Sequence, residues 1–201
     1  MFSKVDYMTV ADHRDNDDWP FEWLPIKGLL PYIRRLGPDT IGIEIGVARA
    51  ESSYAILESC KNVTKLYGID PYLAYKDWNG SVDQEHNDKT KSIALGNMKE
   101  FGDRWQLEEA KSDDWVIEKG KSHTGKIGFV FIDGDHSYEG AKNDIQNYYP
   151  LVKSGGIFAG HDYNLETVRK ALEEFRQEYG IRFPINKLDN NTWFMTKTQL
   201  I

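Results

Sequence analysis

The side chains best suited to chemistry in this sequence directly follow one short apolar run, residues 129–132. They are Asp133, Asp135 and His136, two carboxylates and an imidazole in one place. An uninterrupted apolar run bounded by glycines is typical of a strand buried on both faces, as in a parallel sheet. Ligands bind outside the carboxyl ends of such strands, so Asp133 and His136 are candidate catalytic residues. Alternatively, Asp133-Gly134 only makes a turn and caps the next helix, which leaves the acid and the histidine that follow unexplained.

A second pair, His161 and Asp162, follows the apolar residues 157–160, which form the strand expected next to that of Asp133. The three side chains can therefore converge as metal ligands. Carboxylates suit Mg²⁺ or Ca²⁺, and an imidazole favours Mn²⁺ or Zn²⁺. In a second interpretation the site holds no metal, and His161 or His136 is a general base with a pKa near the working pH. In a third, His161 and Asp162 are helix-capping groups.

Residues 44–52 join the first predicted strand to its helix. Gly46 permits close approach of the backbone to a ligand, and the small side chain of Ala48 keeps the turn tight. A dinucleotide fold would need Gly-x-Gly-x-x-Gly here, and only Gly46 of that pattern is present. Glu44 and Glu51 flank the turn and would oppose a diphosphate. A cationic ligand with amino acid and ribose parts, such as S-adenosylmethionine, is a better electrostatic match; the alternative is a tight turn with a solvated Glu44.

Two further strand ends carry candidate ligand contacts. Asp70 ends the second predicted strand, and an acid about 20 residues beyond the glycine turn can accept hydrogen bonds from both ribose hydroxyls. The alternative for Asp70 is a simple Asp-Pro turn. Ser112 and Asp113 follow the third predicted strand and could meet an adenine edge, but the same pattern is typical of a helix N-cap.

The elements that must position these residues alternate between strand-like and helix-like segments. We expect strands at 41–45, 65–69, 105–110, 127–132 and 157–160, and helices at 50–59, 87–101, 113–118, 138–149 and 165–179. The glycine-rich residues 154–156 separate the fifth strand from the helix before it. Residues 181–188 and 192–196 are typical of a hairpin. The prediction is an α/β fold, a doubly wound seven-stranded, mostly parallel sheet with helices on both faces.

The organisation is that of one domain at residues 39–201, preceded by an N-terminal extension or cap at residues 1–38 that packs near the mouth of the site. Residues 72–86 contain a long loop, and long loops in compact domains are often lids. Its aromatic side chains, Tyr72, Tyr75 and Trp78, either cover a ligand or fill a hydrophobic cluster.

Composition narrows the partners. The chain has 201 residues and a net charge of −7, which argues against nucleic acid, because a phosphate-binding protein needs a basic face. No apolar stretch approaches the length of a membrane span, and the polar residues 1–18 do not resemble a secretory signal. The single cysteine, Cys60, excludes an internal disulfide and is expected in the core. We therefore expect a cytoplasmic protein without a membrane partner.

Four segments carry a family resemblance: Glu-Ile-Gly-Val (44–47) with the following Ser52, Ile-Asp-Gly-Asp-His-Ser-Tyr-Glu-Gly (132–140), Pro-Leu-Val-Lys-x-Gly-Gly (150–156) and Gly-His-Asp-Tyr (160–163). Through them the chain resembles the class I S-adenosylmethionine-dependent methyltransferases, above all the small branch known as methyltransferase domain 24. The resemblance covers roughly residues 40–165 and is most specific at 129–163. It implies a Rossmann-like sheet ordered 3-2-1-4-5-7-6, with strand 7 antiparallel.

The resemblance also implies the roles of individual residues. The backbone at Gly46 would hold the methionine part of the cofactor, Asp70 the ribose, and Ser112 with Asp113 the adenine. The expected cofactor-binding set is Glu44, Gly46, Ala48, Ser52, Asp70, Ser112, Asp113 and Asp133.

Related metal-dependent O-methyltransferases hold Mg²⁺ with an acid after strand four and a pair of residues after strand five. In this chain those positions are Asp133, His161 and Asp162. The sequence departs from the family pattern at the first member of the pair, which is usually an acid and here is His161. Ala50 also stands where a glycine is frequent.

The expected function is S-adenosylmethionine-dependent methylation of a hydroxyl on a small molecule or sugar. The expected catalytic residues are Asp133, His136 and His161, and a divalent metal, Mg²⁺ or Mn²⁺, is the candidate second cofactor. The expected partners are the hydroxyl acceptor and, in a homodimer, a second copy of the chain. A non-catalytic cofactor-binding module is the alternative from another class, although such a module would not need the acids and histidines described above. An NAD-dependent oxidoreductase is a third, and it lacks the glycine fingerprint.

Overall fold

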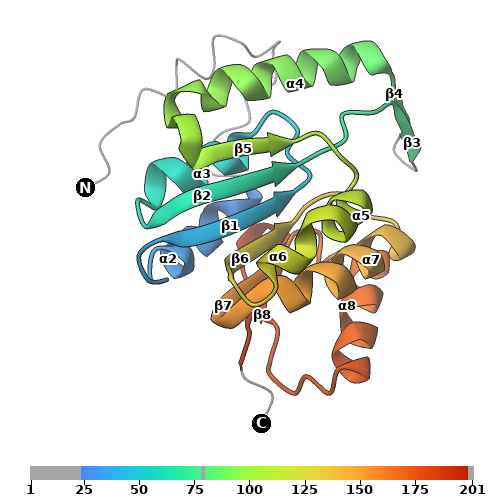
Figure 1. Ribbon diagram of the computed structural model, residues 1–201. Coiled ribbons are helices and arrows are strands. Elements are labelled where there is room, and N and C mark those ends of the chain that lie inside the picture. Colours follow the sequence, from blue (N-terminus) through green and yellow to red (C-terminus); the bar gives the residue numbers. More distant parts are fainter. Residues whose placement is uncertain (1–23, 78–79, 199–201) are drawn as a thin grey trace.

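The computed structural model describes residues 24–77 and 80–198, and its centre is a seven-stranded sheet (Figure 1). The strand order is β5-β2-β1-β6-β7-β9-β8. The strands are β1 (Thr40–Ile45), β2 (Val63–Ile69), β5 (Trp105–Glu108), β6 (Ile127–Ile132), β7 (Val152–Gly160), β8 (Asn186–Lys187) and β9 (Trp193–Thr196). Numbered within this sheet alone, the order is the expected 3-2-1-4-5-7-6. Strand β9 is antiparallel to both of its neighbours, so the predicted fold is confirmed.

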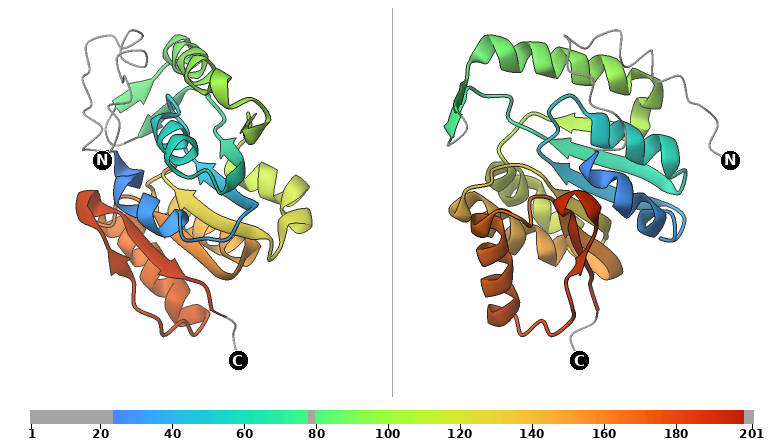
Figure 2. Two further views of the ribbon diagram at one scale, coloured as in Figure 1. Left: turned by 90° about the vertical axis from the view of Figure 1, so that its left-hand side faces the viewer. Right: turned by 180° about the vertical axis from the view of Figure 1, so that it is seen from behind.

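Helices cover both faces of the sheet, as the two turned views make clear (Figure 2). One face is covered by η2 (Pro25–Leu29), α2 (Leu30–Ile33), α3 (Glu51–Ser59) and α4 (Gln84–Met98), whose buried side chains share one hydrophobic cluster. The other face is covered by α5 (Ser112–Trp115), α7 (Tyr138–Tyr148) and α8 (Glu166–Glu178), which share a second cluster. The short helix α6 (Lys121–His123) lies beside α5 (Figure 1). The remaining short elements are η3 (Lys99–Arg104), η4 (Val116–Gly120), η5 (Tyr149–Leu151) and η6 (Asp189–Asn191).

The layering explains why the apolar run of β6 is uninterrupted. All six residues of Ile127–Ile132 are buried, because both faces of this central strand are covered by helices. Polar residues resume at once after the strand, and Ser137 caps α7 by accepting a hydrogen bond from the backbone N–H of Gly140 at 3.1 Å. The chemistry-bearing residues 133–136 thus lie between a buried strand and a capped helix.

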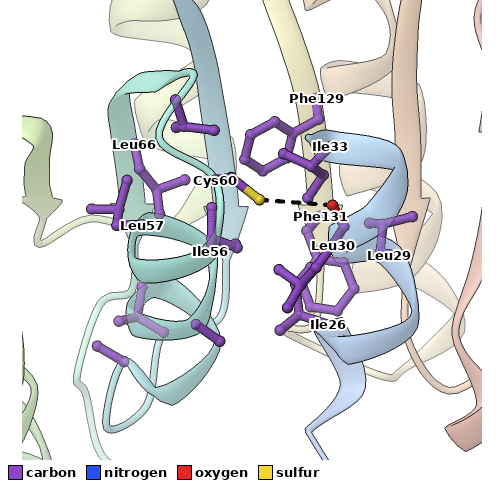
Figure 3. Packing of buried hydrophobic residues seen from close by; sticks show 14 of the residues in the cluster. Ile26, Leu29, Leu30, Ile33, Ile56, Leu57, Cys60, Leu66, Phe129 and Phe131 are labelled. Atoms are coloured by element: carbon purple, nitrogen blue, oxygen red, sulfur yellow. Dashed lines mark hydrogen bonds between the residues drawn. The ribbon is translucent and has the colours of Figure 1, made fainter. Parts of the chain in front are cut away.

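The described part of the expected N-terminal extension packs into the core of the domain. Ile26, Leu29, Leu30 and Ile33 are buried against α3 and β6 (Figure 3). The backbone carbonyl of Leu30 also accepts a hydrogen bond from Cys60 Sγ at 3.7 Å, and Cys60 is fully buried, as predicted. Residues 24–33 therefore belong to the core of the domain, while residues 1–23 lie outside the described residues.

The segment expected as a loop and lid at 72–86 holds a two-stranded hairpin. Strand β3 (Tyr75–Asp77) pairs antiparallel with β4 (Gly80–Val82), and α4 begins directly afterwards at Gln84. Tyr72 is buried, and its hydroxyl donates a hydrogen bond to the carbonyl of Ala48 at 2.7 Å, so this aromatic residue supports the first turn. Tyr75 is 53% exposed, and Trp78 lies outside the described residues.

Two strand boundaries also differ from the sequence predictions. Strand β7 begins at Val152 and runs through the glycines at 154–156. The pairing of β6 with β7 shifts register between Ile127 and Phe129, and this irregularity accommodates the extra residues of β7. In the C-terminal hairpin, the first strand is limited to Asn186–Lys187.

Across the described ranges, no helix has both the length and the apolar character needed to cross a membrane.

Candidate active site

The candidate site lies at the carboxyl ends of β1 and β6, where the strand order of the sheet reverses. The turn after β1 packs directly against the loop after β6. A Cβ atom at residue 46 would lie 2.1 Å from the backbone carbonyl oxygen of Asp133, and Gly46 has a φ of 82°. Glycine is therefore required at this position for both close approach and backbone conformation. Ala48 and Ala50 also have positive φ values, 46° and 62°, so the whole turn is tightly coiled.

Asp70 holds this turn from the end of β2. Its Oδ2 accepts hydrogen bonds from the backbone N–H groups of Val47 at 2.9 Å and Ala48 at 3.1 Å, and its Oδ1 accepts one from Tyr72 at 2.9 Å. An ionised carboxylate offers about four lone-pair sites, so three amides leave capacity for a further donor. The structure places Asp70 beside the turn, as the ribose assignment requires, and adds a structural role for it.

Glu44 lies beneath the turn and is 1% exposed. Its carboxylate accepts a hydrogen bond from Ser53 on α3. Burial raises the pKa of Glu44 to about 8, the hydrogen bond from Ser53 opposes this shift, and the carboxylates of Asp133, Asp70 and Glu51 raise the pKa further. The site thus gathers negative groups and favours a ligand that brings a positive charge.

The two histidines and two of the acids form one cluster after β6 and β7. Asp162 Oδ2 lies 2.7 Å from His136 Nε2 and 3.1 Å from His161 Nδ1. Asp133 Oδ1 lies 3.8 Å from His136 Nε2 and 3.4 Å from His161 Nδ1. The structure therefore brings together four of the five residues that the sequence singled out at these two strand ends. The fifth, Asp135, instead accepts a hydrogen bond within its own loop.

The two histidines are held differently. His161 Nε2 lies 2.5 Å from the backbone carbonyl oxygen of Asn190, which can only accept, so this nitrogen carries a proton. His136 Nε2 is a buried atom without a hydrogen-bond partner among the described residues. It lies 2.7 Å from Asp162 Oδ2, but the two atoms do not have the alignment of a hydrogen bond. Such a pair resembles two ligands that face a shared ion.

The carboxylates control protonation in the cluster. The close approach of the Asp133 and Asp162 carboxylates raises the pKa of His136 to about 10. Burial alone would lower the pKa of His161, but the same two carboxylates outweigh it and raise the pKa to about 10. Burial would likewise raise the pKa of Asp162, and the two histidines hold it below its ordinary value. Without a cation, both imidazoles therefore keep their protons near neutral pH.

A divalent metal fits three of these residues. Asp133, His136 and Asp162 each offer a ligand atom, and these atoms lie within 4.8 Å of one another. Two carboxylate oxygens and one imidazole nitrogen suit Mg²⁺ or Mn²⁺. His161 also lies near the cluster, with its Nδ1 facing Asp133 and Asp162 and its Nε2 held by the carbonyl of Asn190. The histidine in the group of ligand atoms that lie within 4.8 Å of one another is His136.

Ser112 and Asp113 begin α5 and are tied to α7. Asp113 accepts hydrogen bonds from the side-chain amides of Asn143 at 3.4 Å and Asn147 at 3.1 Å, and the carbonyl of Ser112 accepts one from Tyr148 at 2.8 Å. The alternative that these residues cap the helix is wrong, since Lys111 occupies the N-cap position and no side chain caps α5. Ser52 lies half-buried on the first turn of α3.

Two features of the site escaped the sequence analysis. Asp144 is 2% exposed on α7, and burial raises its pKa to about 7, while a hydrogen bond with Ser112 opposes the shift. The available signal was a carboxylate three positions after Ala141, on the apolar face of the helix. The second feature is the contact between Ser53 and Trp105, for which the sequence offers no local signal.

Comparison with known proteins places these residues in a family. The model of the family described as "Methyltransferase domain" matches residues 43–163, more than half of the chain. A sequence relative, the 8-demethyl-8-(2,3-dimethoxy-alpha-L-rhamnosyl)-tetracenomycin-C 4'-O-methyltransferase of Streptomyces olivaceus, is 32% identical over 75 residues, 37% of this chain and 28% of that enzyme. The chain spans 28% to 52% of the length of the curated relatives that it matches.

Solved structures share the fold at low identity. CalS11, a TDP-rhamnose 3'-O-methyltransferase of calicheamicin biosynthesis, is 13% identical with a TM-score of 0.61, over 94% of this chain and 91% of that one. The O-methyltransferase TomG of Streptomyces achromogenes, solved in complex with S-adenosylmethionine, is 12% identical with a TM-score of 0.58, over 86% of this chain and 78% of that one. At these identities, the structural comparisons concern the fold alone.

Proposed function

This chain belongs to the methyltransferase-domain family, and from that membership we propose that it transfers the methyl group of S-adenosylmethionine to a hydroxyl of a small molecule or sugar. The observation that carries the proposal is the position of the family match within the chain. Residues 43–163 contain the turn after β1, Asp70 at the end of β2, and the whole Asp/His cluster after β6 and β7.

The charge of the first turn supports a cationic methyl donor. Glu44, Asp70 and Asp133 approach the same turn, and Glu51 adds a fourth carboxylate. A diphosphate would meet repulsion here, whereas a sulfonium and an ammonium group would meet attraction. We assign the amino acid part of the donor to the Gly46 turn with Ala48 and Ser52. The ribose is assigned to Asp70, and the adenine to Ser112 and Asp113.

The acceptor hydroxyl must lose its proton as the methyl carbon passes from sulfur to oxygen. The carboxylates of Asp133 and Asp162 raise the pKa of both His136 and His161, which favours protonated imidazoles when no cation is bound. Asp133, His136 and Asp162 would hold a divalent cation, Mg²⁺ or Mn²⁺. Such a cation would lower the pKa of a bound hydroxyl, so that its proton can pass to solvent water, and would orient the oxygen.

The chain's own residues would supply the positioning, which accounts for much of the rate in a displacement between two bound substrates. His161 fixes the orientation of Asp162, because its Nδ1 lies 3.1 Å from Asp162 Oδ2 while its Nε2 is anchored on Asn190. The hydroxyl of Thr167 donates to the backbone carbonyl of His136 at 2.7 Å and ties the loop after β6 to α8. We therefore assign His161 a positioning role at the metal-binding residues.

The acceptor class is inferred from two relatives whose names specify rhamnose-linked substrates. A sugar or a small diol could place its hydroxyl beside Asp133 and Asp162. Residues 72–86 are proposed to border this acceptor, since β3 and β4 project beyond the carboxyl ends of the strands (Figure 1). Leu73 and Tyr75 expose 51% and 53% of their surfaces in this segment.

We further propose a cytoplasmic location, from the single buried Cys60, and a homodimer without nucleic-acid partners.

The experiment that tests the function is calorimetric titration with S-adenosylhomocysteine, in Mg²⁺ and again after EDTA treatment. Binding with a micromolar Kd, a binding free energy of about −8 kcal/mol, would support the donor site. Sugar and catechol acceptors would then be screened for methyl transfer. Absence of binding in both buffers would contradict the proposal. Binding without turnover on any diol acceptor would instead favour the non-catalytic module.

A further inference from the structure

A buried chain of polar contacts links the edge strand of the sheet to Glu44. The indole N–H of Trp105 on β5 donates a hydrogen bond to Ser53 Oγ on α3 at 3.2 Å. The hydroxyl of Ser53 in turn donates to Glu44 Oε2 on β1. Ser53 is fully buried, and Glu44 is 1% exposed. Trp105 thus reaches across β2, which lies between β5 and β1 in the sheet.

Gly68 makes this crossing possible. It pairs with Glu44 on β1 and with Leu107 on β5, so it lies in the row that separates the indole from the carboxylate. A Cβ atom at residue 68 would lie 3.2 Å from Trp105 Nε1 and 2.9 Å from Val47 Cγ2. Any side chain at this position would crowd the indole, so the missing side chain leaves the space through which Trp105 reaches Ser53.

The chemistry of the three groups fixes the direction of the hydrogen bonds. An indole N–H can only donate, so Ser53 receives that hydrogen bond on a lone pair and keeps its own proton to donate to Glu44. The contact holds Glu44 Oε2 toward α3. No hydrogen bond to the other oxygen, Oε1, is made by residues within 24–77 and 80–198, so this oxygen can still accept one.

The surroundings of Glu44 define what that donor should be. The charged groups that act on the carboxylate are Asp133, Asp70 and Glu51, and all three are negative. A ligand ammonium at this turn would therefore gain from several carboxylates at once. Its positive charge would also favour ionisation of Glu44, whose carboxyl group is held in place by Ser53. The indole and the hydroxyl act on the ligand only through that carboxylate.

We propose that Trp105 and Ser53 are positioning residues that orient Glu44 toward the ammonium group of the methyl donor. This inference rests on the function proposed above, since it needs S-adenosylmethionine at the Gly46 turn. It adds a requirement that is specific to the amino acid part of the donor and leaves the ribose and adenine parts unaffected.

The test compares two ligands that differ in that part alone. S-adenosylhomocysteine carries the ammonium and carboxylate, whereas 5'-methylthioadenosine keeps the adenine and ribose without them. Trp105→Phe removes the hydrogen bond to Ser53, whereas Ser53→Ala removes both that hydrogen bond and the one to Glu44. Each change shrinks the side chain, so neither overfills the core. We expect each to weaken S-adenosylhomocysteine binding by about tenfold, in the range of one hydrogen bond to a charged group, and to leave 5'-methylthioadenosine binding unchanged.

Ser59→Ala is the matched control, because Ser59 lies at the far end of the same helix and outside this chain of contacts. It should bind both ligands as the unmodified protein does. Equal loss for both ligands in Trp105→Phe and Ser53→Ala would mean a general structural role and would overturn the inference. Unchanged affinity for both ligands would also overturn it. If the unmodified protein itself binds no S-adenosylhomocysteine, the proposed function fails and this inference fails with it.

Discussion

The backbone carbonyl oxygen of Asp133 occupies the space that a side chain at Gly46 would need: a Cβ atom there would lie 2.1 Å from it. The N–H of Asp133 also donates to the carbonyl of Ile45 at 2.8 Å, so the loop after β6 is fastened to the turn after β1 from both sides. The turn that is proposed to bind the methyl donor and the loop that carries Asp133 are therefore directly joined. A change in the turn should be felt at both.

Gly46→Ala should accordingly disrupt more than the cofactor turn. The added methyl group must displace the Asp133 loop, and alanine is strained at a φ of 82°. We expect a loss of stability of at least about 1–3 kcal/mol, together with loss of S-adenosylhomocysteine binding. Chemical denaturation and calorimetry on the same preparation measure both effects. Gly96→Ala is the control, since a Cβ atom there meets no atom within 4 Å and the residue lies within α4.

Asp70→Ala should weaken cofactor binding and also cost stability. The carboxylate accepts hydrogen bonds from the backbone N–H groups of Val47, Ala48 and Tyr72, and its removal leaves these donors without their partner. Hydrogen bonds to a charged group are worth about 1.5–3 kcal/mol, so a loss of that order in unfolding free energy is expected. Asp70→Asn keeps one acceptor oxygen and should recover part of the stability. An Asp70→Ala protein of unchanged stability and unchanged affinity would contradict both roles.

Much of this arrangement follows from local sequence patterns. The apolar run of β6, the Ser137 cap of α7 and the clustering of acids and histidines at two strand ends are encoded within a few residues of each other. The order of the strands was available from the family resemblance. The glycine turn and Asp70 lie at neighbouring strand ends, as expected, because the carboxyl ends of parallel strands meet at one edge of the sheet.

The features that were missed depend on contacts between distant residues. The metal set expected from the family resemblance contains His161, whereas the three ligand atoms that lie within 4.8 Å of one another include that of His136, and this depends on how two distant strand ends meet. The hydrogen bond from Trp105 to Ser53 joins residues 52 positions apart in the sequence, and it depends on the absence of a side chain at Gly68. Side-chain direction at such contacts is decided by packing, which has no local periodicity.

The choice of histidine gives a third prediction. If His136 is a metal ligand and His161 a positioning residue, His136→Ala should lower Mn²⁺ affinity more than His161→Ala does. Outer-shell partners are typically worth about 10- to 100-fold in metal affinity, so His161→Ala should fall in that range and His136→Ala beyond it. Calorimetric titration of each variant with Mn²⁺ alone measures this, and EDTA should abolish methyl transfer in the unmodified protein. The reverse order of affinities would identify His161 as the ligand.

The burial of Glu44 gives the last prediction, which concerns pH. Its pKa in the folded state is about 8, against an ordinary value of 4.5, so the folded protein retains a proton that the unfolded chain has released between these values. The protonation of Glu44 therefore makes its full contribution to the free energy of unfolding below pH 4.5. This contribution is lost as pH rises toward 8, by at most about 1.4 kcal/mol per pH unit.

Glu44→Gln removes the titration and keeps an acceptor for Ser53. The difference in unfolding free energy between this variant and the unmodified protein should therefore grow with pH, in favour of the variant, while contributions from His136 and His161 cancel in the comparison. The same variant should bind S-adenosylhomocysteine more weakly, because the ammonium loses a carboxylate. Denaturation at several pH values between 4.5 and 8 measures the first effect. A constant difference across that range would show that Glu44 is ionised in the folded protein, and would remove the basis for a carboxylate that is charged only when a cationic ligand is bound.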